Sequence, residues 1–308
     1  MPSSGSYDFS INRDDLIKAS LRALVVISAN DTPPAAQIAN GAQALNMMLK
    51  AWAADGIKTF TLKRATVFMQ NAKTTYNLGL TGDHATHSYS ETTVKVDAAA
   101  SATTIDFTNT AGMTAADYIG IILTNGNVHW TTIQSVTDPD TAVITSGIPT
   151  AAAAGNKVFW YTTKIPRPLD IVHSFVSVGN DDYTIEKYQR DRYWDMPRKN
   201  WSSRPTAFYY DQTYPTGTFY VNYQPTNFTE KVELVYRRPI EDFDAATDTP
   251  DIPPELWEAA KFGLAARLAF EYGRTDKIPA LLQAEAIAKS MAMNVLGDNV
   301  RYVIPTRF

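Results

Sequence analysis

The spacing of hydrophobic residues changes twice along this chain, and that change limits the architectures available to it. Apolar residues recur at helical spacing near both ends and alternate with period two over much of the stretch between them. Each terminal helix pair needs a partner for its apolar side, so the two pairs are expected to pack together. The predicted fold class is therefore α+β, in which N- and C-terminal helix pairs form one helical bundle, and an antiparallel β domain between them carries a small inserted all-β module.

Helix-capping residues support the first helix pair. Residues 11–28 read as a helix with Asn12 at the N-cap and acidic residues in the first turn. A second helix is expected to start with Thr32 as the cap and Pro33 at the first helical position, and to end at Gly56. These two helices are predicted to form a helical hairpin.

The central stretch reads as strands. Residues 59–70 and several runs in 166–240 are rich in β-branched and aromatic residues, and Val232, Leu234 and Tyr236 alternate strictly with their neighbours. Residues 93–163 are poor in charge, and turn signals divide them into short runs. The predicted organisation is a helical bundle (10–57 and 251–296), a β domain (58–92 and 164–245), an inserted β module (93–163) and an extended C-terminal tail (297–308).

Composition excludes several functional classes. The chain has 308 residues, is 44% hydrophobic and has a net charge of −4, so it can bury a sizeable core and lacks the basic balance of a free-standing nucleic-acid binder. No run of about 18 apolar residues predicts a membrane span, and the N-terminus has no signal-peptide layout. The absence of cysteine excludes disulfides, thiolate metal sites and a cysteine nucleophile.

Two small polar clusters contain residue types that can carry chemistry. His84 and His87 have the residue type of zinc ligands, but nothing in the sequence ties a third ligand to them, and an exposed polar turn is the favoured interpretation. Asp181, Asp182 and Glu186 could serve glycoside hydrolysis, which needs two carboxyls about 5 to 10 Å apart. Adjacent residues on a turn point in different directions, so a plain turn is favoured. No phosphate loop or nucleophile motif is present, and neither catalysis nor a cofactor is predicted.

Aromatic and basic residues interleave between residues 188 and 223. On a β surface such a mixture can form a subunit interface, stack on sugars or contact single-stranded nucleic acid, and it can also be ordinary core. Core or interface is the favoured interpretation. The candidate surface residues are Arg192, Tyr193, Trp194, Arg198, Trp201, Tyr209 and Tyr210.

The helix expected within 251–273 lacks a single apolar face. Its charges change sides halfway along, and its many alanines keep it thin. Such a helix can be packed by its own bundle at one end and by an adjacent subunit at the other, or it can be central in its own bundle. The candidate interface residues are Trp257, Lys261, Arg267 and Glu271.

Several stretches in a fixed order resemble the head-tail connector (adaptor) proteins of tailed bacteriophages, in particular the tail accessory or packaged-DNA-stabilising proteins of short-tailed phages. No single motif carries chemistry, and the order of the motifs carries the resemblance. The stretches are ALNMMLKAWAADGI (44–57), TTYNLG (74–79), IPRPLDIVHSF (165–175), RYWDMPRKNWSSRPTAFYYDQ (192–212), FYVNYQP (219–225), and VELVYRRPIEDFD leading into IPPELWEAAKFGLAARLA.

The resemblance implies a structural virion protein at the phage head-tail junction, assembled in the host cytoplasm. It implies a ring of about twelve identical subunits docked under the portal protein, extending the DNA channel and offering a platform for downstream tail or nozzle proteins. The C-terminal tail is expected to contact the portal or a neighbouring subunit through Val300, Arg301, Tyr302, Val303, Ile304 and Phe308. Double-stranded DNA would pass through a lumen that is not basic, without sequence-specific binding.

Two alternatives remain open at this stage. The first is a carbohydrate-binding or carbohydrate-degrading phage tail protein that uses the Tyr- and Trp-rich β domain. The second is a single-strand nucleic-acid binder that uses the basic and aromatic block.

Overall fold

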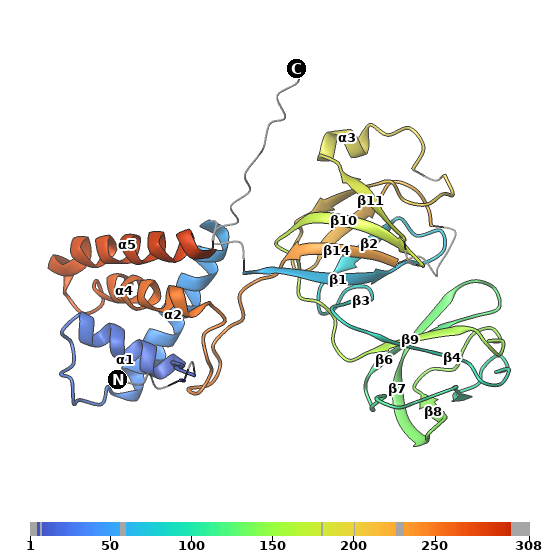
Figure 1. The fold of residues 1–308 in the computed structure, drawn as a ribbon, viewed down its shortest axis with the longest axis horizontal. Coiled ribbons are helices and arrows are strands. Elements are labelled where there is room, and N and C mark those ends of the chain that lie inside the picture. Colours follow the sequence, from blue (N-terminus) through green and yellow to red (C-terminus); the bar gives the residue numbers. More distant parts are fainter. Residues whose placement is uncertain are drawn as a thin grey trace. The chain divides into compact units, whose positions relative to one another are not determined.

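The computed structural model describes residues 5–6, 8–55, 60–179, 181–199, 201–225 and 231–296. The chain divides into two compact units (Figure 1). Residues 1–61 and 239–308 form a helical unit, and residues 62–238 form a β unit. In the part of the chain that the structure describes, no helix combines the length and hydropathy that a membrane crossing requires.

The predicted α+β class is wrong, because β structure dominates the described residues. These residues form one sheet of eight strands, one sheet of six strands and five α-helices. Of the described residues, 26% are helical. The insertion was expected to be a small module, but its short runs pair into a full sheet with a core of its own. Short strands bury one face each and need many neighbours, so a stretch rich in them contributes more β structure than its length suggests.

The helical unit contains α1 (Arg13–Ala23), α2 (Ala35–Asp55), a short 3-10 turn (Pro254–Leu256), α4 (Trp257–Leu268), a second 3-10 turn (Thr275–Lys277) and α5 (Ile278–Leu296). The predicted N-cap is confirmed, since the Asn12 side chain accepts a hydrogen bond of 2.8 Å from the backbone N–H of Asp15. The start predicted at Pro33 is two residues early, because α2 begins at Ala35.

Helix α4 lies at the centre of this unit and contacts α1, α2 and α5 (Figure 1). Its small residues let these neighbours approach closely. The buried residues of α4 are Ala259, Ala260, Gly263, Leu264, Ala265, Ala266 and Leu268. They share one core with Leu16, Ile17, Leu21, Leu45, Met48, Leu49 and Trp52.

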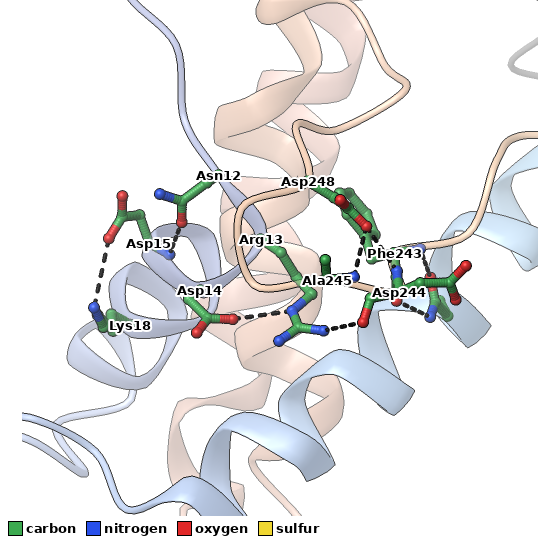
Figure 2. A network of polar contacts seen from close by, with 10 residues as sticks. Asn12, Arg13, Asp14, Asp15, Lys18, Phe243, Asp244, Ala245 and Asp248 are labelled. Carbon is green, nitrogen blue, oxygen red and sulfur yellow. Dashed lines mark hydrogen bonds and ion pairs between the residues drawn. The ribbon is translucent and has the colours of Figure 1, made fainter.

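The acidic loop that precedes α4 is fixed to the first two helices (Figure 2). The guanidinium of Arg13 donates to the carbonyl of Asp244 at 3.1 Å, and the Arg13 backbone N–H donates to the carbonyl of Asp248 at 2.8 Å. The Asp248 carboxylate accepts from the backbone N–H groups of Asp244 and Ala245 at 2.8 and 2.7 Å. Asn46 of α2 exchanges two hydrogen bonds with the Phe243 backbone. Hydrogen bonds to its backbone therefore hold the loop in place against α1 and α2.

The eight-stranded sheet has the order β2-β13-β12-β11-β10-β14-β1-β3. Its interior strand β14 buries Val232, Leu234 and Tyr236, as the alternation predicted, and pairs antiparallel with both neighbours. The strands are β1 (Leu62–Phe68), β2 (Thr75–Leu78), β3 (Ala85–Thr86), β10 (Asp170–Val178), β11 (Asp181–Lys187), β12 (Ala207–Asp211), β13 (Gly217–Val221) and β14 (Lys231–Arg237).

This sheet is not wholly antiparallel, which corrects a further part of the fold prediction. Strands β11 and β12 pair in parallel, with Glu186 opposite Ala207. A parallel pair needs a crossover connection, and here the connection contains α3 (Arg190–Trp194) and the loop that follows it. The crossover places α3 and its loop beside the end of β11 (Figure 1).

The six-stranded sheet has the order β4-β9-β6-β7-β8-β5. Its strands are β4 (Ser90–Thr93), β5 (Thr104–Asp106), β6 (Tyr118–Ile122), β7 (Val128–Asp138), β8 (Thr141–Ile144) and β9 (Lys157–Tyr161). The sheet begins at Ser90, three residues before the predicted start of the insertion.

An aromatic cluster joins the two sheets within the β unit. Phe68 of β1 packs against Trp130, Phe159 and Tyr161 of the six-stranded sheet, with ring centroids 4.9 to 5.9 Å apart. Nearby, the ammonium of Lys231 donates to the hydroxyl of Tyr89 at 2.7 Å and pairs with Glu91. The insertion is therefore packed onto the eight-stranded sheet by buried aromatic contacts.

Candidate functional site

The crossover between β11 and β12 gathers aromatic and basic side chains, some buried and some exposed, on one surface of the β unit. We call this the aromatic-basic surface. It consists of Arg190, Arg192, Tyr193, Trp194, Arg198, Lys199, Trp201, Arg204, Tyr209 and Tyr220. Of the seven surface residues that the sequence proposed, six belong to it.

Tyr193 anchors α3 to the sheet. It is 2% exposed, stacks on Tyr209 with centroids 5.8 Å apart, and donates from its hydroxyl to the carbonyl of Val221 at 3.3 Å. Its neighbour Trp194 is 50% exposed and contacts Tyr193 and Tyr220 edge-on. Helix α3 is short and has few internal hydrogen bonds, so the buried ring of Tyr193 holds it in place. The exposed indole of Trp194 therefore has a defined position.

Cations lie over several of these rings. The Lys199 ammonium is 5.4 Å from the Tyr193 centroid and 5.2 Å from that of Trp194, and it also donates to the Trp194 carbonyl at 2.8 Å. The Arg198 guanidinium is 5.5 Å from the ring of Trp201, which is 55% exposed. Cation–π contacts at exposed sites contribute about 0.5–1 kcal/mol each, enough to favour these orientations. Lys199 therefore closes the end of α3, whereas Arg198 projects from the loop.

Tyr210 does not belong to this surface. It alternates with Tyr209 along β12, so its ring points into the core of the eight-stranded sheet, and its hydroxyl donates to the Pro168 carbonyl at 2.5 Å. Burial raises the pKa of Tyr210 well above its ordinary value. The period of two decides this placement, because neighbouring strand residues cannot share a face.

The exposed carboxylates of Asp191 and Asp195 lie among these cations, and the positive charge of the surface is only partly neutralised. Arg192 pairs with both oxygens of Glu186, which raises the pKa of the guanidinium above its ordinary value. Arg190 and Arg198 are exposed and form no ion pair with any described residue. These two guanidinium groups are consequently available to a negatively charged partner.

A pocket of about 510 Å³ opens beside Trp201. Its walls come from the loop after α3 and include Met196, Pro197, Arg198 and Lys199. A second hollow on the same loop, of about 390 Å³, adds Ser203 and Tyr223. The lining combines apolar side chains with the cations Arg198 and Lys199, and the described lining residues include no carboxylate and no histidine. Such a lining can contact a partner that offers apolar surface and negative charge.

The two histidines of the polar turn have separate packing roles. The His84 ring stacks on Trp130 with centroids 4.0 Å apart, and its Nδ1 is 2.6 Å from the Tyr161 hydroxyl. Burial, helped by the positive charges of Lys164 and Lys73, lowers the pKa of His84 from 6.5 to about 3. His87 instead stacks on Tyr236. Among the described residues, no three His, Cys, Asp or Glu side chains form a metal-binding group.

The carboxylates weighed for glycoside chemistry lie along β11. Asp181 and Asp182 stand at the start of the strand, opposite Val178 and Ser177 of β10, whereas Glu186 lies near its end and is paired with Arg192. All three are exposed, and none of them lines the two hollows beside Trp201.

Three candidate interface residues, Trp257, Lys261 and Arg267, lie on α4, and Glu271 follows the end of this helix at Leu268. Those on α4 make their contacts within their own unit. Trp257 is half-buried, donates from its indole to the Ile252 carbonyl at 3.2 Å and packs against Phe9. The Arg267 guanidinium donates to the Gly263 carbonyl at 3.0 Å and lies 3.8 Å from a Glu285 oxygen. Lys261 is half-buried over Phe262, and Glu271 is exposed. The candidate contact residues of the tail, 300–304 and 308, lie outside the described residues.

The residue pattern of α5 indicates a surface that the sequence analysis did not single out. Leu282, Ile287 and Met291 are 48%, 49% and 65% exposed. The two charged residues of this helix, Glu285 and Lys289, lie one turn apart on the inner side, which leaves the outer half uncharged. A helical projection of 278–296 would have revealed this. We call it the α5 face; it comprises Pro279, Ala280, Leu282, Gln283, Ala286, Ile287, Ser290, Met291 and Asn294.

Comparisons with known proteins do not assign the chain to a family. No protein-family model matches it, and no curated protein matches it either.

Proposed function

We propose that this chain is a structural virion protein, a head-tail adaptor that docks as a ring under the portal protein of a tailed phage. In that position it extends the DNA channel and provides the attachment platform for downstream tail components. The chain acts through contacts and performs no catalysis.

The α5 face is the observation that carries this proposal. Half of a surface helix has no charge and leaves three large apolar side chains in water, whereas a solvated helix places charged groups there. Uncharged helix faces with exposed Leu, Ile and Met are typical of protein–protein contacts. We assign this face to the portal, and the order of the motifs that resemble connector proteins supports that choice.

Electron microscopy of the full chain mixed with its cognate portal tests the proposal. The expected result is a ring of identical subunits attached to the portal, with the helical unit in contact with it. A chain that stays monomeric beside the portal would overturn the proposal. Deleting residues 298–308 should weaken docking, and unchanged portal binding would remove the role proposed for the tail.

The ring also suits DNA passage. The helical unit is acidic and the whole chain carries a net charge of −4, so a ring presents few cations to phosphates that slide past. A reconstruction whose channel wall is lined with Arg and Lys would contradict this part of the proposal.

A carbohydrate-binding tail protein is the second candidate. The half-exposed Trp201 beside the pocket of about 510 Å³ favours it, because an indole face can stack on a sugar ring. Glycan binding by the isolated chain, lost in Trp201→Ala, would support this function over the adaptor.

A further inference from the structure

We infer that the aromatic-basic surface of one copy binds the acidic strap of the next copy in the ring. The acidic strap is the segment 241–258, which consists of the acidic loop described above and the start of α4. Hydrogen bonds hold it to α1 and α2. It contains Glu241, Asp242, Asp244, Asp248, Asp251, Glu255 and Glu258 and no Lys or Arg. This inference rests on the proposed function, since it names the contact between neighbouring subunits of the ring.

The charges of the two surfaces are complementary. Glu241, Asp244, Glu255 and Glu258 are exposed and form no ion pair with a described residue. Within the strap, Asp242 pairs with Lys50 at 2.9 Å. The opposite surface offers Arg190 and Arg198, which are also exposed and unpaired among the described residues. Matching charges of this kind steer association and fix the orientation of the partners.

Both surfaces are rigid enough to form an interface. The strap is held by the hydrogen bond from Arg13 shown in Figure 2 and by the hydrogen bonds of Asn46 with the Phe243 backbone. The opposite surface is fixed by the buried ring of Tyr193 and by Lys199. Because little ordering is needed on either side, the entropic cost of association is small. The exposed Trp194 and Trp201 supply the residue type that dominates binding energy in interfaces.

Ring symmetry requires two different surfaces on each copy. A twofold contact pairs a patch with itself, whereas a closed ring of more than two copies uses a head-to-tail contact between unlike patches. This chain has an acidic patch on the helical unit and a basic, aromatic patch on the β unit. Like charges keep each patch from pairing with itself, and opposite charges favour the head-to-tail contact.

Charge-reversed full-length chains mixed with the cognate portal test the inference. The first variant is Arg190→Glu with Arg198→Glu, and the second is Glu241→Lys with Asp244→Lys. None of these four side chains forms a hydrogen bond with a described residue, so both variants should fold like the wild type. Each variant alone should need a protein concentration higher by on the order of tenfold or more to form rings.

Mixing the two variants identifies which copy supplies each patch. An alternating ring brings every normal basic patch to a normal acidic one and every reversed patch to its reversed complement, so the mixture should assemble. The chain that carries all four substitutions should also assemble. If that chain assembles and the mixture does not, the two patches meet within one chain, and the inference is overturned.

Matched controls separate this contact from general charge effects and from the proposed function. Lys63→Glu with Lys277→Glu, and Asp138→Lys with Asp276→Lys, change the charge equally outside the two patches and should assemble normally. If the wild type forms no ring on the portal, the proposed function fails. If the wild type forms rings and the first two variants do so equally well, only the subunit contact is wrong.

Salt-sensitive binding of a single-stranded oligonucleotide by the wild type, lost in the first variant, would assign the aromatic-basic surface to nucleic acid instead.

Discussion

The indole N–H of Trp52 donates a hydrogen bond of 3.1 Å to a carboxylate oxygen of Glu285 inside the helical unit. This contact joins α2 to α5 beside α4. Gly263 of α4 leaves room for it, since a Cβ there would lie 2.8 Å from the Glu285 carboxylate carbon. Arg267 and Lys289 lie 3.8 and 3.9 Å from the same oxygen, so the buried carboxylate is compensated on three sides.

Replacing Glu285 should separate the hydrogen bond from the charge. Glu285→Ala leaves the buried indole N–H without an acceptor and should lower the free energy of unfolding by about 2–3 kcal/mol. Glu285→Gln keeps an acceptor and should cost about 1 kcal/mol. Urea unfolding followed by circular dichroism measures both, with the exposed Glu271→Ala as the control. Equal losses in the two Glu285 variants would show that the charge dominates.

Acidification should weaken the contact between the two sheets of the β unit through His84. Burial lowers the pKa of this histidine in the folded chain to about 3, below its ordinary value of 6.5. Between these values the unfolded chain binds a proton that the folded chain does not, so stability is present above the ordinary pKa and is lost as pH falls toward 3. At about pH 5 the loss amounts to about 2 kcal/mol. In His84→Asn this component should vanish, which unfolding curves at neutral and acidic pH would detect; an equal pH dependence in both chains would contradict the assignment.

Gly217 should be indispensable to the eight-stranded sheet. A Cβ at this position would lie 1.8 Å from the Tyr210 hydroxyl, which is fixed by its bond to the Pro168 carbonyl. Gly217→Ala should therefore destabilise the chain by about 3 kcal/mol. Gly155→Ala, where the added Cβ meets open space and only the backbone conformation resists, should cost about 1 kcal/mol. Thermal unfolding of the two variants gives the comparison, and equal losses would mean that the Tyr210 ring moves aside.

A charge on the α5 face should abolish docking without harming the fold. Ile287 is half-exposed, so Ile287→Asp should lower the free energy of unfolding by only about 1 kcal/mol. The same substitution places an uncompensated charge in the proposed portal contact and should prevent ring formation. Thr275→Asp adds the same charge on an exposed turn outside this face and should dock normally. Microscopy with the portal measures both; normal rings of the Ile287 variant would exclude the α5 face from the contact.

Local patterns were sufficient to place many elements correctly. The alternation in 231–237 predicted which face of β14 is buried, and Asn12 caps α1 as its residue type indicates. Helix α1 nevertheless stops at Ala23, where the sequence predicted continuation to residue 28. The backbone of Val25 is left-handed with φ of 59°, a conformation that β-branched residues disfavour and that no local propensity foretells.

The sequence by itself determined the periodicities, the absence of thiol chemistry, the clustering of aromatic and basic residues and the acidic run before α4. Only the tertiary structure decided how those residues are used. It placed α4 at the centre of its unit and Tyr210 in the core of the eight-stranded sheet, whereas Tyr209 lies on the other face of that sheet. It also paired the short runs of the insertion into a six-stranded sheet. The reason is physical: a side chain's face follows from local backbone period, whereas its neighbours depend on strand order and chain crossovers that bring distant segments together.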